Sequence, residues 1–160
     1  MYKGLFAMLA IASLIGCAET RKLMGEDVKK TNLVACPATK TAIGDVPSCG
    51  KVWKIASGYG QLSPEGDLEV EVKGLVLNDA STGDSNGTPD GVDGVAAAVV
   101  CHGISAFKVG AQTDVVPLSK TGDATIKSKV SVPADCTKPV IVVRERYEGK
   151  IGGWLAATGS

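Results

Sequence analysis

Short runs of alternating apolar and polar residues are the dominant pattern in the chain after residue 50. The clearest run covers residues 67–77, which begins with three apolar residues separated by charged neighbours. A period of two gives a β-strand one apolar face and one solvated face. Gly74 interrupts the alternation, and the apolar residues 75–77 then predict a bulge or a move into a fully buried position.

Patterns of this kind along the chain predict an all-β fold. Residues 95–101 are small and wholly apolar, which favours a place between two sheets. Residues 140–147 and 151–157 predict a terminal hairpin that turns at residues 148–150. Further strands are predicted over residues 51–56, 106–109, 114–118 and 124–132. We therefore expect an antiparallel β-sandwich with an immunoglobulin-like Greek key, and a jelly roll or small barrel as the alternative.

The amino terminus has the pattern of an export signal. Lys3 precedes an unbroken apolar stretch over residues 5–15. This stretch is too short to span a bilayer as a helix, which takes about 20 residues. A basic residue followed by a short apolar run and small residues is typical of a signal peptide.

The tetrad Leu14-Ile15-Gly16-Cys17 resembles the lipobox of bacterial lipoproteins. The resemblance implies a lipoprotein signal peptide over residues 1–16 and a lipid on Cys17, which would become the first residue after cleavage. Two alternatives remain: an ordinary secretory peptide cut after Ala18, and a pilin-like leader cut after Gly4. With lipidation, the chain is exported and lipid-anchored to the bacterial cell envelope, on its periplasmic or outer surface.

The cysteine count agrees with lipidation. Five cysteines are an awkward number for an exported protein, and setting Cys17 aside leaves four. Four cysteines can form two disulfides in an oxidising compartment, with three connectivities open. The spacing favours Cys36 with Cys49 and Cys101 with Cys136.

Length and charge limit the organisation and the partners. A chain of 160 residues is long enough for one core of ordinary size. We expect a flexible tether over residues 17–32 and a single β-sandwich domain over residues 33–160. Acidic and basic residues balance at 17 each, so no basic field is present to attract nucleic acid.

The mature chain is also similar, loosely, to uncharacterised exported bacterial proteins. That resemblance implies a disulfide between Cys101 and Cys136, and it supplies no function. It rests on residues 72–77, 98–101, 121–124, 132–136, 139–142 and 154–159.

The loop over residues 79–93 is the stretch with the most suggestive chemistry. Its carboxylates and amide, separated by glycines, are ligand types that calcium prefers. The end of the loop, residues 88–93, resembles the end of a thrombospondin-type calcium repeat, but the aspartate and glycine expected in the middle are missing. Asp, Asn, Gly and Pro are also the standard turn residues, so a solvated hairpin loop is the favoured interpretation. The candidate calcium ligands are Asp84, Asn86, Asp90 and Asp93.

Catalytic motifs are weak. Ser48 and Lys51 fit Ser-x-x-Lys, but the second box of penicillin-binding proteins is missing. His102, the only histidine, has no second histidine for a triad and no metal ligand at a diagnostic spacing, which favours a surface or turn position. We therefore expect neither an enzyme nor a cofactor, apart from the calcium alternative.

These observations together predict a membrane-anchored binding or adhesion module of the cell envelope. Its protein or glycan ligand would contact the loop 79–93 or the terminal hairpin with Arg144, Arg146, Tyr147 and Trp154. Alternatively, the arginines solvate an exposed face and Trp154 fills the core. A structural subunit of a surface assembly is the second functional hypothesis, and a small envelope hydrolase is the third.

Overall fold

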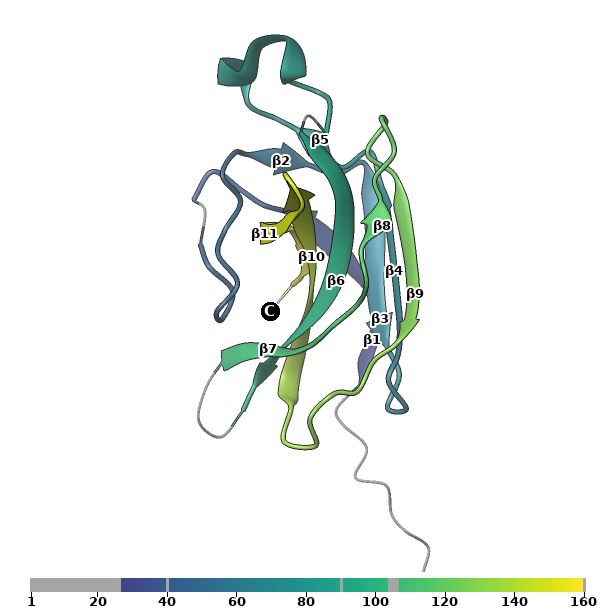
Figure 1. Cartoon of the computed structure of the whole chain (residues 1–160). Helices are drawn as coiled ribbons and strands as arrows, with labels where there is room; N and C mark the ends of the chain where they lie inside the picture. The colour runs from purple at the N-terminus through teal and green to yellow at the C-terminus, as the bar shows by residue number, and fades with distance from the viewer. Residues whose placement is uncertain (1–26, 40, 90, 104–106, 160) are drawn as a thin grey trace, which may run out of the picture.

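The computed structural model describes residues 27–39, 41–89, 91–103 and 107–159. These residues form eleven strands and one short 3-10 helix, η1 (Ala80–Ser85) (Figure 1). All pairs between these strands are antiparallel. The strands are β1 (Val28–Ala35), β2 (Trp53–Lys54), β3 (Ser57–Leu62), β4 (Asp67–Lys73), β5 (Val76–Leu77), β6 (Val92–His102), β7 (Phe107–Gln112), β8 (Val116–Pro117), β9 (Ala124–Lys129), β10 (Thr137–Tyr147) and β11 (Lys150–Thr158).

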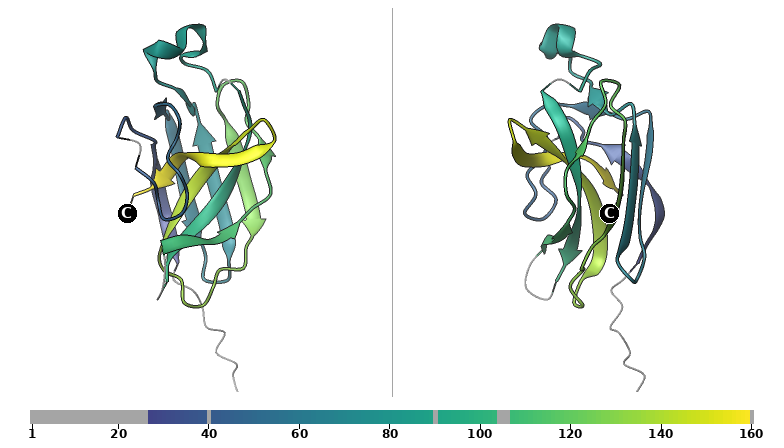
Figure 2. Two further views of the ribbon diagram at one scale, coloured as in Figure 1. Left: turned by 60° about the vertical axis from the view of Figure 1, so that its left-hand side comes forward. Right: turned by 45° about the vertical axis from the view of Figure 1, so that its right-hand side comes forward.

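Two antiparallel layers share strand β1. The order is β7-β6-β10-β11-β1-β3-β4-β9, with β8 also paired to β6, and β2 and β5 form a separate two-stranded sheet. The first part of β1 pairs with β3 and its end pairs with β11, so the sandwich curls into a half-barrel. Figure 2 shows β3, β4 and β9 as one layer and β6 and β10 as the other. The predicted all-β antiparallel class is confirmed.

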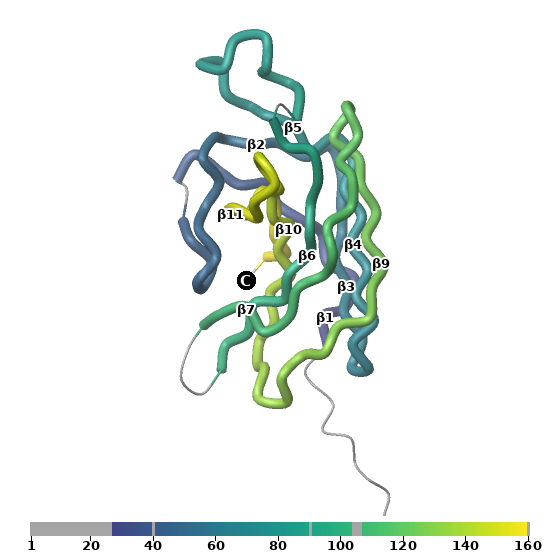
Figure 3. Tube along the Cα trace, viewed as in Figure 1, coloured from purple at the N-terminus to yellow at the C-terminus, as the bar shows by residue number. Residues whose placement is uncertain are grey.

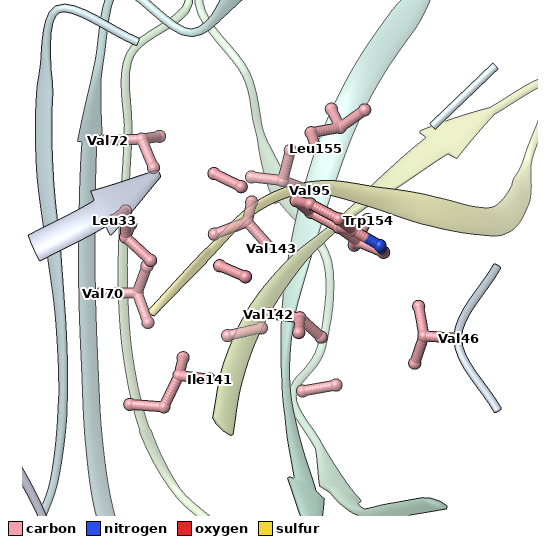
Figure 4. Close-up of a cluster of buried hydrophobic side chains, with 14 of the residues drawn as sticks. Leu33, Val46, Val70, Val72, Val95, Ile141, Val142, Val143, Trp154 and Leu155 are labelled. Atoms are coloured by element: carbon pink, nitrogen blue, oxygen red, sulfur yellow. The ribbon is translucent and has the colours of Figure 1, made fainter. Parts of the chain in front are cut away.

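The core lies between these layers. Leu68, Val70 and Val72 are buried in β4, while the charged residues between them are at least partly exposed, as the alternation predicts. The facing layer contributes Ile141 and Val143 of β10, among others (Figure 4). After β4, residues 75–77 are all buried, which confirms the predicted move into the interior.

A loop buries the outer face of β6 and β10 as well. This covering loop, residues 36–39 and 41–52, lies between β1 and β2 and runs beside β7 and β11 (Figure 3). Its Val46 is fully buried and lies on the opposite side of β10 from Val70 (Figure 4). Trp154 donates its backbone N–H to the Pro47 carbonyl at 3.0 Å, which holds the loop to β11. The apolar run of β6 is therefore buried on both faces, by a sheet on one side and largely by a loop on the other.

Both predicted disulfides are present. Cys36–Cys49 closes the covering loop, and Cys101–Cys136 joins β6 to the residue before β10. All four cysteines are buried. The bridges therefore form part of the packed core.

Three parts of the sequence prediction differ from the structure. The tether was expected to extend to residue 32, but residues 28–32 belong to β1, where Val28 pairs with Leu62. Strand β3 was not predicted, because Ser57 and Gly58 have the composition of a turn. It forms because β1 and β4 pair with its two edges, which outweighs its weak intrinsic propensity. The predicted strand over 51–56 is reduced to β2, and the signal peptide (1–16) and Cys17 lie outside the described residues.

Candidate functional site

The arginines of the terminal hairpin form intramolecular contacts. Arg144 donates from Nε and Nη2 to the Gly152 carbonyl at 3.1 and 2.9 Å, and from Nη1 to Gln112 Oε1 at 2.7 Å. Arg146 donates from Nε to Asp93 Oδ1 at 2.8 Å, and this contact lowers the pKa of the Asp93 carboxyl. Both guanidinium groups thus stabilise the hairpin and its neighbours.

The two aromatic residues of the hairpin differ in exposure. Trp154 is 7% exposed and donates from Nε1 to the Thr41 carbonyl at 2.9 Å, so it fastens the covering loop to β11. Tyr147 is 48% exposed and packs against the backbone at Gly91. Of the four predicted ligand contacts, Tyr147 is the most exposed.

The loop after β5 is organised as a capped turn. It carries η1 and projects beyond the end of the sandwich (Figure 1). Asp79 Oδ1 accepts from the Ser81 N–H at 3.0 Å and from its hydroxyl at 2.6 Å. Asn86 Oδ1 accepts from the Asp79 N–H at 3.1 Å. These are the local contacts expected of Asx turns, in agreement with the favoured interpretation of this loop.

The structure does not gather the described calcium candidates into one group. Asp84 lies in η1, Asn86 ends that helix, and Asp93 is in β6 beside Arg146. Asp90 lies outside the described residues. Among the described residues, no group of three or more His, Cys, Asp or Glu side chains is arranged to hold a metal ion. Calcium binding stays a prediction.

An apolar groove of about 590 Å³ lies on the outer face of the β6–β10–β11 layer, beside the covering loop. Val34 of β1 borders it and is 62% exposed, because alternation along β1 turns Leu33 inward and Val34 outward. The His102 ring stacks on Phe107 with 3.8 Å between ring centroids. The main side chains of the apolar groove are Val34, Ile43, His102, Phe107, Val140 and Trp154.

A smaller hollow, the end crevice, has a volume of about 190 Å³. It lies between the two-stranded β2–β5 sheet and the end of β10, and Lys51 and Glu145 are among its polar lining residues. Glu145 is half-buried, and this burial raises the pKa of its carboxyl group. Its other principal lining side chains are Trp53, Leu77, Val92 and Tyr147.

The outer face of the β3–β4–β9 layer carries mutually neutralised charges. Glu69 accepts from the Tyr59 hydroxyl at 2.8 Å and forms an ion pair with Lys127 at 3.1 Å. The hydrogen bond from Tyr59 is the main cause of the lowered pKa of Glu69. Lys30 lies 3.7 Å from the centre of the Tyr59 ring. This face matches the solvated surface that the alternation in β4 predicts.

Sequence reasoning missed both hollows. The apolar groove depends on how the covering loop folds back. Val34 gives little signal because it belongs to a run of only three apolar residues, 33–35, between a polar stretch and a cysteine. Glu145 stands between two arginines, a pattern typical of a solvated strand face. The raised pKa that marks Glu145 as a candidate functional residue comes from tertiary burial.

Comparisons with protein-family models, with curated proteins and with solved structures found no match to this chain. Within the part of the chain that the structure describes, no helix has the length and apolarity needed to cross a membrane. The two hollows are therefore the candidate sites of this protein.

Proposed function

We propose that this protein is an exported binding module, anchored to the bacterial cell envelope by a lipid on Cys17, whose ligand docks in the apolar groove. The two disulfides support an oxidising, extracytoplasmic location. The lipobox-like tetrad before Cys17 supports the anchor. The observation that carries the proposed site is the exposure of Val34 at the edge of the groove.

The exposure of Val34 favours a partner with apolar contact groups. Complete burial of a valine side chain is worth roughly 1.5–3 kcal/mol, so covering the part of Val34 that is exposed contributes about 1–2 kcal/mol. The partly exposed Phe107 extends the apolar surface from Val34 across the strands, and the buried Trp154 lies at the floor of the groove. An apolar or aromatic side chain of a partner protein fits this surface best, and the apolar face of a sugar ring is the second choice.

Site-specific photo-crosslinking tests the ligand site. A photoreactive phenylalanine analogue at position 34 is expected to give a discrete adduct when the full-length protein is crosslinked in the cells that produce it. The matched control is the same analogue at Thr125, which is exposed on β9 of the other layer. The proposal fails if position 34 yields no adduct, or the same adducts as position 125.

Mass spectrometry tests the anchor. We expect the mature chain to begin at Cys17 with two or three acyl chains, and Cys17→Ala to release the protein from the membrane fraction. An unmodified amino terminus at Glu19 would contradict lipidation and support the ordinary secretory peptide.

The structural-subunit hypothesis stands second. Strand addition needs an accessible sheet edge, and β7 and β9 end the main sheet. The Val109 N–H of β7 donates to Asp45 Oδ1 at 2.8 Å, and β9 carries Lys127 and Lys129, so both edges have features that hinder strand addition. Concentration-dependent filaments seen by electron microscopy would favour the subunit.

We further propose that the protein is not a hydrolase. Activity on ester, peptide or glycan substrates that disappears when a single carboxylate or serine is mutated would overturn this statement and favour the third hypothesis.

A further inference from the structure

A β-bulge at the end of the terminal hairpin fixes the position of Glu145. Arg144 pairs with Trp154 and Arg146 pairs with Ile151, so residues 152 and 153 both oppose Glu145. A bulge of this kind leaves backbone groups outside the ladder. Glu145 Oε1 accepts from the Gly153 N–H at 3.3 Å, which holds the carboxylate against β11.

The second carboxylate oxygen of Glu145 accepts no hydrogen bond from the residues that the structure describes. Among the described residues, the hydrogen bond to Glu145 Oε1 is the only one that its carboxylate receives, and none of the ion pairs involves it. Lys51 lines the same hollow and forms no ion pair with it within 4.0 Å. This oxygen is accessible to solvent, so it can accept from a ligand that brings a positive charge or a hydrogen-bond donor.

Two aromatic residues line the end crevice together with Glu145. Trp53 is 5% exposed and Tyr147 is 48% exposed, so one ring is buried and the other is accessible. The Tyr147 ring lies against Gly91, because a Cβ atom added to Gly91 would be 2.3 Å from Tyr147 Cε2. Aromatic faces attract cations through their quadrupole, and tryptophan is the strongest of them.

We infer that the end crevice binds a primary or methylated ammonium group, with Glu145 as its counter-ion and Trp53 and Tyr147 as its aromatic walls. The volume of about 190 Å³ equals roughly six water molecules in liquid water. This space admits one ammonium head group with a short alkyl stem. The inference is independent of the apolar groove, which lies on a different face and contains none of these residues.

NMR titration of the protein with n-butylammonium chloride tests the inference, with n-butanol as the uncharged probe of similar shape. We expect saturable shifts that centre on the Trp53 indole N–H and the Gly153 amide, and no comparable response to n-butanol. Glu145→Gln keeps an oxygen that can accept from the Gly153 N–H, so the bulge is preserved while the charge is removed. This variant is expected to weaken n-butylammonium binding at least tenfold.

Two further variants make the test specific. Lys51→Ala is expected to strengthen binding, because it removes a competing positive charge at the rim, and Val34→Asp in the apolar groove is expected to leave binding unchanged. The inference is overturned if the shifts do not saturate, if n-butanol produces them equally, or if Glu145→Gln binds as the original chain does while its spectrum shows a folded protein. Tighter binding of an acetyl-Gly-Lys-Gly-amide peptide than of n-butylammonium would assign the site to protein lysines, and weaker or equal binding would assign it to free amines.

Discussion

Removing the two disulfides one at a time is expected to show how much of each one's contribution to the free energy of unfolding comes from chain entropy and how much from local packing. The variants are Cys36→Ala with Cys49→Ala, and Cys101→Ala with Cys136→Ala, both in a chain that also carries Cys17→Ser so that no fifth thiol interferes. All four bridge cysteines are at most 5% exposed, so the lost sulfur contacts are similar in the two variants. The difference between them therefore reports mainly the size of the ring that each bridge closes.

The ring sizes give the magnitude. The bridges span 13 and 35 residues, which correspond to about 3 and about 4 kcal/mol of lost chain entropy in the unfolded state. We expect loss of Cys101–Cys136 to lower the free energy of unfolding by about 0.9 kcal/mol more than loss of Cys36–Cys49. Two backbone hydrogen bonds hold the covering loop independently of its disulfide: the Cys36 N–H donates to the Leu155 carbonyl and the Trp154 N–H donates to the Pro47 carbonyl.

Urea denaturation of the three chains measures these free energies. Because the covering loop is expected to stay in place, the slope of the unfolding free energy against urea should be the same for both variants. The reasoning is refuted if the Cys36–Cys49 variant is destabilised as much as the other one. A smaller slope for that variant would show that the loop detaches, so that the disulfide acts through packing of the native state.

Three further predictions concern turns, pH and calcium. Gly122→Ala should lower the free energy of unfolding by about 2 kcal/mol or more, because Gly122 has φ +80° and a Cβ would lie 2.3 Å from the Leu75 carbonyl oxygen. The control is Gly149→Ala, at φ +75° without a close contact, which should lower it by about 1 kcal/mol in the same urea assay. Hydrogen bonds from the Gly74 N–H and the Thr121 hydroxyl lower the pKa of the Asp123 carboxyl from its ordinary value of 3.8. The stability lost in Asp123→Asn should therefore be constant above pH 3.8 and vanish as pH falls through the pKa of Asp123 in the folded protein. A constant difference in melting temperature down to pH 2 would contradict this prediction. Because hydrogen bonds to Asp79 and Asn86 organise the loop 79–93 as turns, CaCl₂ should raise the melting temperature no more than MgCl₂ does. A calcium-specific rise abolished by Asp84→Asn would establish the calcium hypothesis.

The stability of the hairpin should also respond to the charge of Glu145. Burial raises the pKa of this carboxyl group, so its charged form is disfavoured in the folded protein. The stability contributed by the protonated form is present at low pH and is lost as pH rises through the folded pKa. Glu145→Gln is therefore expected to raise the melting temperature at pH 7 and to lose this advantage near pH 4, and an unchanged melting temperature at pH 7 would contradict the reasoning.

Local sequence patterns were sufficient to predict most of the strands. The alternation in β4 and β9 identifies the buried face of each strand, because the side-chain period of a strand depends on its own residues. The hairpin turn between β10 and β11 was predicted from Glu148 and Gly149, which both adopt positive φ angles. The disulfide pairing was also predicted, since spacing and an even count restrict the choices.

Features that depend on contacts between distant segments required the tertiary structure. Strand β3 exists because β1 and β4 pair with it, and the apolar run of β6 is buried on both faces because the covering loop folds over one of them. The same loop creates the apolar groove beside Val34, and the bulge opposite Glu145 places a carboxylate in the end crevice. The sequence by itself determined which residues prefer strands, turns and burial, because these preferences are local. Only the tertiary structure decided which surfaces stay uncovered, because exposure depends on where every other segment packs.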